Sequence, residues 1–102
     1  MSQIFETEDN VIIRIMTEGQ YYLEGTHLDT LNNLDNEIVN AVASENDSEF
    51  RQLLTNMLEL VRTKGTPVPL EEILESDIVL PEPDITLLEA EEQFVGEGLV
   101  PG

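Results

Sequence analysis

The sequence predicts an α+β fold with a small N-terminal antiparallel β-hairpin, a central antiparallel helix hairpin and a short C-terminal helix. Three observations predict it: a β-branched segment followed by a glycine-containing turn, two consecutive apolar stripes of helical period, and a third helical pattern beyond two proline-containing segments. The 102 residues are enough for one domain of ordinary size. We therefore expect a single domain over residues 11–102, preceded by an N-terminal extension of residues 1–10.

The hairpin is predicted near the start of the chain. Residues 11–16 are mainly β-branched or apolar, and residues 20–23 include two tyrosines, which strands favour. Gly19 lies in the connection between them, where we expect a positive φ. Residues 4–7 either add a third strand or fray. The N-terminal extension is therefore expected to be either an extra strand or a flexible segment.

The first helix of the central pair is predicted over residues 27–44. Its apolar residues recur at steps of three and four, which places them on one face of a helix. Thr26 and Asp29 have the spacing of a capping box, so Thr26 is predicted to close the start of the helix. The stripe consists of Leu28, Leu31, Leu34, Ile38 and Val42.

The second helix is predicted over residues 47–64 and has the most regular apolar stripe in the chain. Asp47 is its predicted N-cap, and Gly65 is its predicted C′ residue before a proline stops further helix. Only residues 44–47 separate the two stripes, so the helices should form an antiparallel pair with their apolar faces together. The stripe consists of Phe50, Leu53, Leu54, Met57, Leu58 and Val61.

The region after the helix pair is rich in proline and is predicted to be mostly extended. A short helix is expected at residues 70–74. Residues 76–83 contain a three-residue apolar run between turn formers, which indicates a packed extended segment with Ile78 and Leu80 facing inward.

The last helix is predicted over residues 85–95. Thr86 and Glu89 have the capping-box spacing, and apolar residues follow them at helical intervals. The apolar residues 98–102 either fold back on the core or act as a short linear peptide for a partner.

Charge restricts the classes of partner. With 22 acidic residues against 4 lysines and arginines, the formal net charge is −18. Proteins that bind nucleic acids or anionic membranes use clusters of Lys and Arg, so we expect no direct nucleic-acid binding and no direct membrane insertion. Without a cationic, apolar leader, a cytoplasmic location is expected, and the acidic surface supports a halophilic source as a hypothesis beside an ordinary cytosol. The four cations are Arg14, Arg51, Arg62 and Lys64.

No catalytic, cofactor or metal site is predicted. The chain has no cysteine, and its one histidine, His27, is interpreted as a surface residue at a helix start. The carboxylates occur as scattered singles and pairs such as Glu71-Glu72, which favours solvated surface, and the glycines form no phosphate-binding motif. An enzyme is therefore the least favoured class.

Three segments resemble a known family. They are residues 12–21 (IIRIMTEGQY), 76–81 (SDIVLP) and 98–102 (GLVPG). In this order they resemble PspAA, the domain associated with phage shock protein A (PspA), across residues 11–102. Residues 1–10 lie outside the resemblance, and the central helices match by pattern alone.

The resemblance implies a non-enzymatic partner or modulator of a PspA-type protein, a helical coiled-coil protein that assembles on stressed membranes. It implies no cofactor and no catalytic residues. Membrane association would then occur through the partner. Whether the chain also associates with itself is not determined by the resemblance.

Five residues are the predicted partner-binding anchors: Arg14, Tyr21, Tyr22, Leu99 and Val100. Arg and aromatic residues often dominate interfaces, and the hairpin edge or the exposed side of the helix pair is expected to dock against a partner helix. Because Tyr21 and Tyr22 alternate along a strand, they should face opposite sides, and one of them is expected to cover the core instead. A second function hypothesis is an acidic mimic of nucleic acid that inhibits a basic nucleic-acid-binding protein.

Overall fold

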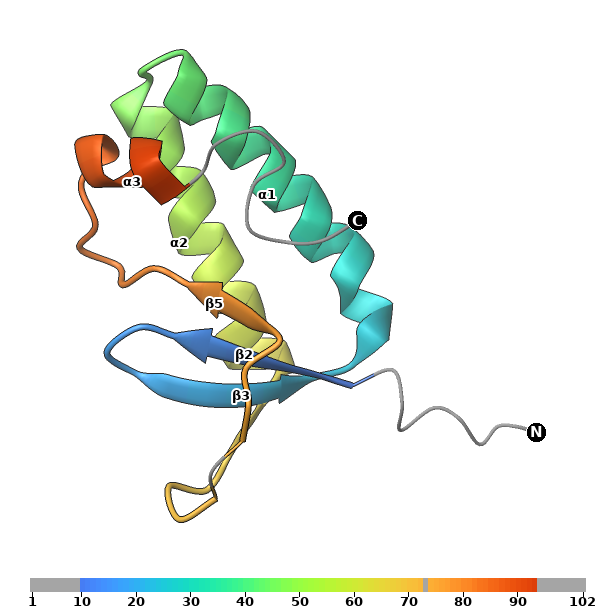
Figure 1. The fold of residues 1–102 in the computed structure, drawn as a ribbon. Coiled ribbons are helices and arrows are strands. Elements are labelled where there is room, and N and C mark those ends of the chain that lie inside the picture. The colour runs from blue at the N-terminus through green and yellow to red at the C-terminus, as the bar shows by residue number, and fades with distance from the viewer. Residues whose placement is uncertain (1–9, 73, 94–102) are drawn as a thin grey trace.

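The computed structural model describes residues 10–72 and 74–93 (Figure 1). The chain forms a mixed sheet, two long helices and a short third helix, so the predicted α+β fold is confirmed. Predictions for residues 4–7, 94–95 and 98–102 lie outside the described residues. The elements are β2 (Val11–Ile15), β3 (Gly19–Leu23), the 3₁₀ helix η2 (Gly25–His27), α1 (Leu28–Ala43), α2 (Asp47–Lys64), β4 (Thr66–Pro67), β5 (Ile78–Leu80) and α3 (Leu87–Gln93).

The sheet has the strand order β4-β3-β2-β5. β2 and β3 form the predicted antiparallel hairpin, with Ile13 opposite Tyr21, and β4 pairs antiparallel with β3. β5 joins the other side of β2 as a parallel strand, with Ile13 opposite Ile78. Ile78 and Leu80 are both buried, as predicted, but the sequence pattern does not indicate that their segment pairs with β2.

The connection between β2 and β3 is a tight turn, in which the Glu18 N–H donates to the Ile15 carbonyl oxygen at 2.9 Å. Gly19 has a φ of +133°, which confirms the predicted positive φ at this glycine. Thr17 also has a positive φ, 72°, which β-branched residues rarely adopt. The turn therefore carries backbone strain at Thr17, which the residue type alone does not predict.

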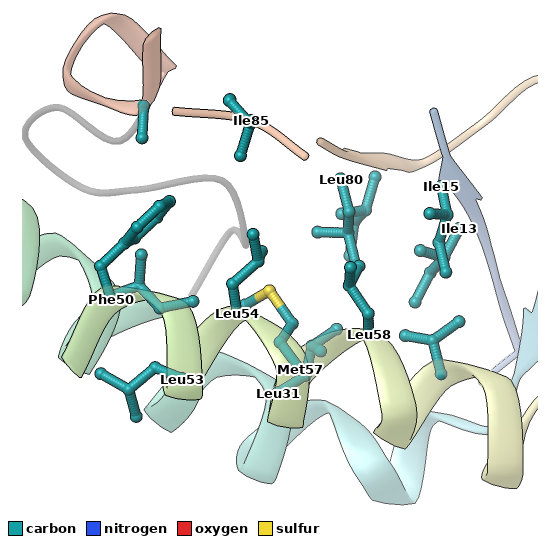
Figure 2. Packing of buried hydrophobic residues seen from close by; sticks show 14 of the residues in the cluster. Ile13, Ile15, Leu31, Phe50, Leu53, Leu54, Met57, Leu58, Leu80 and Ile85 are labelled. Carbon is teal, nitrogen blue, oxygen red and sulfur yellow. The ribbon is translucent and has the colours of Figure 1, made fainter. Parts of the chain in front are cut away.

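The helix pair covers one face of the sheet, and the core lies between the two layers (Figure 1). Figure 2 shows Leu58 of α2 pointing toward Leu80 of β5, with Ile13 and Ile15 of β2 beside them. Each such fully buried side chain contributes about 2 kcal/mol through removal of apolar area from water. The predicted stripe of α2 is confirmed, because its buried residues are Phe50, Leu53, Leu54, Met57, Leu58 and Val61.

The start of α1 differs from the prediction. Thr26 lies inside η2, and no side-chain cap bond closes the start of η2 or of α1, so the predicted capping box of Thr26 with Asp29 is wrong. The 3₁₀ turn supplies a backbone alternative, in which the His27 N–H donates to the Glu24 carbonyl oxygen at 3.0 Å.

The end of α1 is a Schellman motif. The Asn46 N–H donates to the Ala41 carbonyl oxygen at 2.9 Å, and the Glu45 N–H donates to the Val42 carbonyl oxygen at 3.0 Å. Glu45 occupies the C′ position with a φ of 57°, where Gly or Asn is usual. This sharp reversal brings α2 back beside α1 as the predicted helix pair (Figure 1).

The ends of α2 correct two predictions. The N-cap is Asn46, whose side chain accepts from the Glu49 N–H at 3.2 Å, and Asp47 is the first helical residue. The helix ends at Lys64, as predicted, but Gly65 has an extended backbone with a φ of −88°. A Cβ at Gly65 would lie 2.5 Å from the Val61 carbonyl oxygen, so close approach to backbone is what requires glycine there.

The segments after β4 also differ in detail. Among the described residues of 70–74 the predicted short helix is absent, and a turn forms instead, with the Glu72 N–H donating to the Pro69 carbonyl oxygen at 3.0 Å. α3 begins at Leu87, two residues later than predicted. Its capping box is confirmed, because the Glu89 N–H donates to Thr86 Oγ1 at 3.1 Å and the Thr86 N–H donates to Glu89 Oε1 at 3.0 Å.

Candidate interaction surface

The outer face of the sheet points away from the helix pair and brings two of the predicted anchors together. Arg14 is opposite Gln20 on β3 and opposite Val79 on β5, so these side chains share one face. Tyr22 lies on the same face, one residue beyond the inward-facing Tyr21. The predicted opposition of the two tyrosines is thus consistent with the register.

Tyr21 and the C-terminal anchors do not join this face. Tyr21 is partly buried and packs against the hydrophobic core, opposite the fully buried Ile13. The expectation that one tyrosine covers the core therefore holds for Tyr21. Leu99 and Val100 lie outside the described residues.

A segment that we call the crossing segment, residues 68–72 and 74–77, links β4 at one edge of the sheet to β5 at the other edge. Gln20 Nε2 donates to the Leu74 carbonyl oxygen at 2.9 Å and to Ser76 Oγ at 2.8 Å. The Ile12 N–H donates to the Asp77 carboxylate at 2.8 Å. These bonds hold the crossing segment against the hairpin and leave another part of the outer face open.

Tyr22 is one of the groups that hold the crossing segment. Its hydroxyl donates to Glu72 Oε1 at 2.9 Å. This hydrogen bond raises the pKa of Tyr22 above its ordinary value of 10.0, because the carboxylate accepts from the phenol and repels the phenolate. Tyr22 thus has a bonding partner within the chain.

The open part of the outer face is what we call the outer patch: Arg14, Met16, Leu70 and Val79. Met16 is 42% exposed, Val79 is 46% exposed and Leu70 is 93% exposed. Arg14 and Leu70 both line a hollow of about 100 Å³ between the hairpin and the crossing segment. The apolar members are not among the predicted site residues; for Met16 the signal is the strand alternation, which places residues 14 and 16 on one face.

Arg62 joins the hairpin turn to α2. Its guanidinium forms ion pairs with Glu18 and with Glu59, and its Nε donates to Glu18 Oε1 at 3.0 Å. These hydrogen bonds lower the pKa of Glu18 below 4.5, and the same contacts raise the pKa of Arg62. Arg62 therefore has a structural role.

The other three cations have different surroundings. Arg51 stacks over the Phe50 ring at 5.0 Å and donates to the Pro83 carbonyl oxygen at 2.9 Å. Lys64 lies in the last turn of α2, where a cation stabilises the helix dipole. Arg14 is exposed and forms no ion pair or hydrogen bond in the part of the chain that the structure describes.

Asp35 is the one acidic side chain that is buried among the described residues, with 0% exposure. It interrupts the apolar stripe of α1 between Leu31 and Ile38. The expectation that the carboxylates form solvated surface is wrong for this residue. Its position four residues after Leu31 and three before Ile38 is the signal that would have located it.

Three further observations bear on chemistry. Glu82, Ile85, Glu89 and Glu92 line a hollow of about 190 Å³ beside α3. Within residues 10–72 and 74–93, no group of three or more His, Cys, Asp or Glu is arranged to hold a metal ion. In the same ranges, no helix has the length and apolar content needed to cross a membrane.

Comparison with known proteins identifies a family. The family model of the PspA-Associated protein (PspAA) matches residues 11–102, which is most of the chain and the range of the resemblance seen in the sequence. Neither the curated proteins nor the solved structures provide a match. The family name implies association with PspA. With the whole hairpin, helix pair and α3 inside the matched range, the chain belongs to the PspA-associated protein family.

Proposed function

We propose that this protein is a non-enzymatic interaction module that binds a PspA-type coiled-coil protein and modulates it in the membrane (phage-shock) stress response. The observation that carries the proposal is the family match over residues 11–102. The open, partly apolar outer patch supports it, because exposed apolar groups beside an unpaired arginine are typical of protein interfaces.

The contact region in this proposal is the hairpin side of the molecule. The exposed side of the helix pair is the less suitable face, since its exposed central positions are mainly polar and offer no apolar stripe to a partner. These positions are Asn33, Asn36, Glu37, Asn40, Gln52, Thr55, Asn56 and Glu59. Arg14 and Tyr22 remain the anchors on the hairpin, and Leu99 and Val100 are proposed as a second contact from the C-terminal residues.

Association with membranes, in this proposal, is indirect. A net charge of −18 is repelled by an anionic lipid surface, whereas a partner that itself binds lipid can tether the protein. Addition of anionic vesicles to the purified protein should give no co-sedimentation, and addition of the partner should produce it. Co-sedimentation without the partner would contradict the indirect role.

The direct test is binding between the purified full chain and the PspA-type protein of the same organism, measured by calorimetry at the salt concentration of its cytoplasm. Saturable binding would support the proposal, and its absence at high micromolar concentration would refute it. The charge of −18 favours the nucleic-acid mimic as a second candidate. Selective capture of a basic nucleic-acid-binding protein, released by competing DNA, would support that candidate instead.

We also propose that the acidic surface is an adaptation to a salt-rich cytoplasm. The support is the imbalance of 22 acidic residues against 4 cations, whose mutual repulsion salt screens. The midpoint of thermal unfolding should then rise as salt increases from low to molar concentration. An unchanged midpoint over that range would refute the adaptation.

A further inference from the structure

We infer that the outer patch is the docking site for one α-helix of the PspA-type partner, which lies along β2 and presents a carboxylate to Arg14 between apolar side chains. The inference rests on the proposed function and deepens it, because it assigns the surface and the chemistry of the partner's contacting element.

The first argument is exposed apolar area that the chain leaves uncovered. Val79 lies directly beside Arg14 in the sheet, and Met16 follows two residues along the chain from Arg14. Both are more than two-fifths exposed, although their neighbours Ile15 and Leu80 are completely buried. Apolar side chains on both sides of an arginine form the kind of centre that interface hot spots have.

The second argument is charge. Arg14 has no ion pair among the described residues, and the nearby Glu72 already accepts the Tyr22 hydroxyl. The complement of a free guanidinium is a carboxylate, which it binds with two parallel hydrogen bonds. On the side of Val79 and Met16, apolar side chains would shield that pair from water, which strengthens it.

The third argument is spacing. Side chains on one face of a strand repeat about every 6.7 Å, and positions i and i+4 of an α-helix are about 6.0 Å apart along the axis. A helix laid along β2 can therefore place a carboxylate at Arg14 and an apolar residue one turn away at Met16. A coiled-coil protein presents long helices of this kind on its surface.

The hollow next to Arg14 extends the site. Its volume of about 100 Å³ accommodates one side chain from the docked helix, and Leu70 forms part of its lining while remaining almost fully exposed. A second copy of this chain is the less suitable occupant, because each copy carries −18 and offers no unpaired helix stripe in its described residues.

The test is calorimetric titration of the full-length partner into four variants of the full chain at one salt concentration. Arg14→Glu should weaken binding roughly 30-fold or more, and Val79→Thr, which keeps β-branching, should weaken it roughly 5-fold. Lys64→Glu makes the same charge change away from the patch and should stay within about 2-fold, as should Leu88→Ser, which removes an exposed leucine from α3. Circular dichroism and urea unfolding check that each variant is folded. A partner variant with its contacting Glu changed to Arg should restore binding to Arg14→Glu.

The outcomes separate the inference from the proposed function. If the wild-type chain does not bind the partner, the proposed function fails. If the wild-type chain binds, and folded Arg14→Glu and Val79→Thr bind equally well, the docking site is wrong while the function stands. If light scattering shows a wild-type dimer that Arg14→Glu converts to monomer without loss of partner binding, the patch binds a second copy and the inference is overturned.

Discussion

The hairpin turn should become more stable when Thr17 is replaced by glycine. Thr17 has a φ of 72°, and a left-handed conformation costs an L-residue about 1–2 kcal/mol. Glycine avoids this cost but loses about 0.5–1 kcal/mol of additional chain entropy on folding. Because the Thr17 side chain is exposed, its removal costs no packing. The net gain should be about 1 kcal/mol, which for a chain of this size raises the melting temperature by roughly 4–8 °C.

Urea unfolding at one fixed salt concentration is the appropriate assay, because screening of the net charge would otherwise shift stability as well. Thr17→Ala is the matched control: it removes the side-chain branch but keeps Cβ, so most of the strain remains. Thr17→Asn should give an intermediate gain, since Asn tolerates the left-handed region. If Thr17→Gly is no more stable than Thr17→Ala, the strain assigned to this residue is wrong.

Other parts of the structure give three further predictions. Glu45→Gly should stabilise the protein by roughly 0.5–1 kcal/mol in urea unfolding, because the C′ position of α1 has a positive φ; an equal gain for Glu45→Ala would point to charge removal instead. Glu18→Gln should cost about 1 kcal/mol at pH 7, because the variant loses the ion pair with Arg62. The folded-state pKa of Glu18 is lowered from 4.5, so this stabilisation is present above pH 4.5 and is lost as pH falls through the folded pKa; a difference from wild type that does not shrink as pH falls below 4.5 would contradict the ion pair. Leu58→Ala should cost roughly 2–5 kcal/mol because Leu58 is 1% exposed, whereas Leu88→Ala should change stability by less than about 0.5 kcal/mol because Leu88 is 76% exposed; similar losses would contradict the core assignment.

Periodic burial is the part of this fold that sequence reasoning recovers well. The stripe of α2, from Phe50 to Val61, is predicted residue by residue, because a long helix with one buried face repeats the same signal over about three turns. The inward direction of Ile78 and Leu80 is recovered for the same reason on the shorter period of a strand. Local chemistry also identifies the capping box of α3, whose two partners are three residues apart.

Long-range geometry is the part that the sequence does not reveal. The parallel pairing of β5 with β2 joins residues more than sixty positions apart, and three residues carry too little pattern to specify it. The sequence also does not reveal which of two adjacent residues is the N-cap of α2. Asn46 and Asp47 are both good N-caps, and only the Schellman turn at Glu45 decides between them. Gly65 is predicted as the C′ residue of α2, whereas the structure requires glycine there because the Val61 carbonyl oxygen approaches closely.

The candidate surface also depends on long-range geometry, because the sequence pattern alone does not fix the register of its strands. Alternation alone places Tyr21 and Tyr22 on opposite faces, but it does not say which of them faces the core. That choice depends on the pairing of Ile13 with Tyr21, and a slip of one residue would exchange the two tyrosines and every other side chain on β3. The register in turn is held by the tight turn at Thr17 and Gly19 and by the bonds from Gln20 to the crossing segment. The exposure of Arg14 on the outer face is therefore a property of the assembled sheet and of its register, and no local sequence pattern determines it alone.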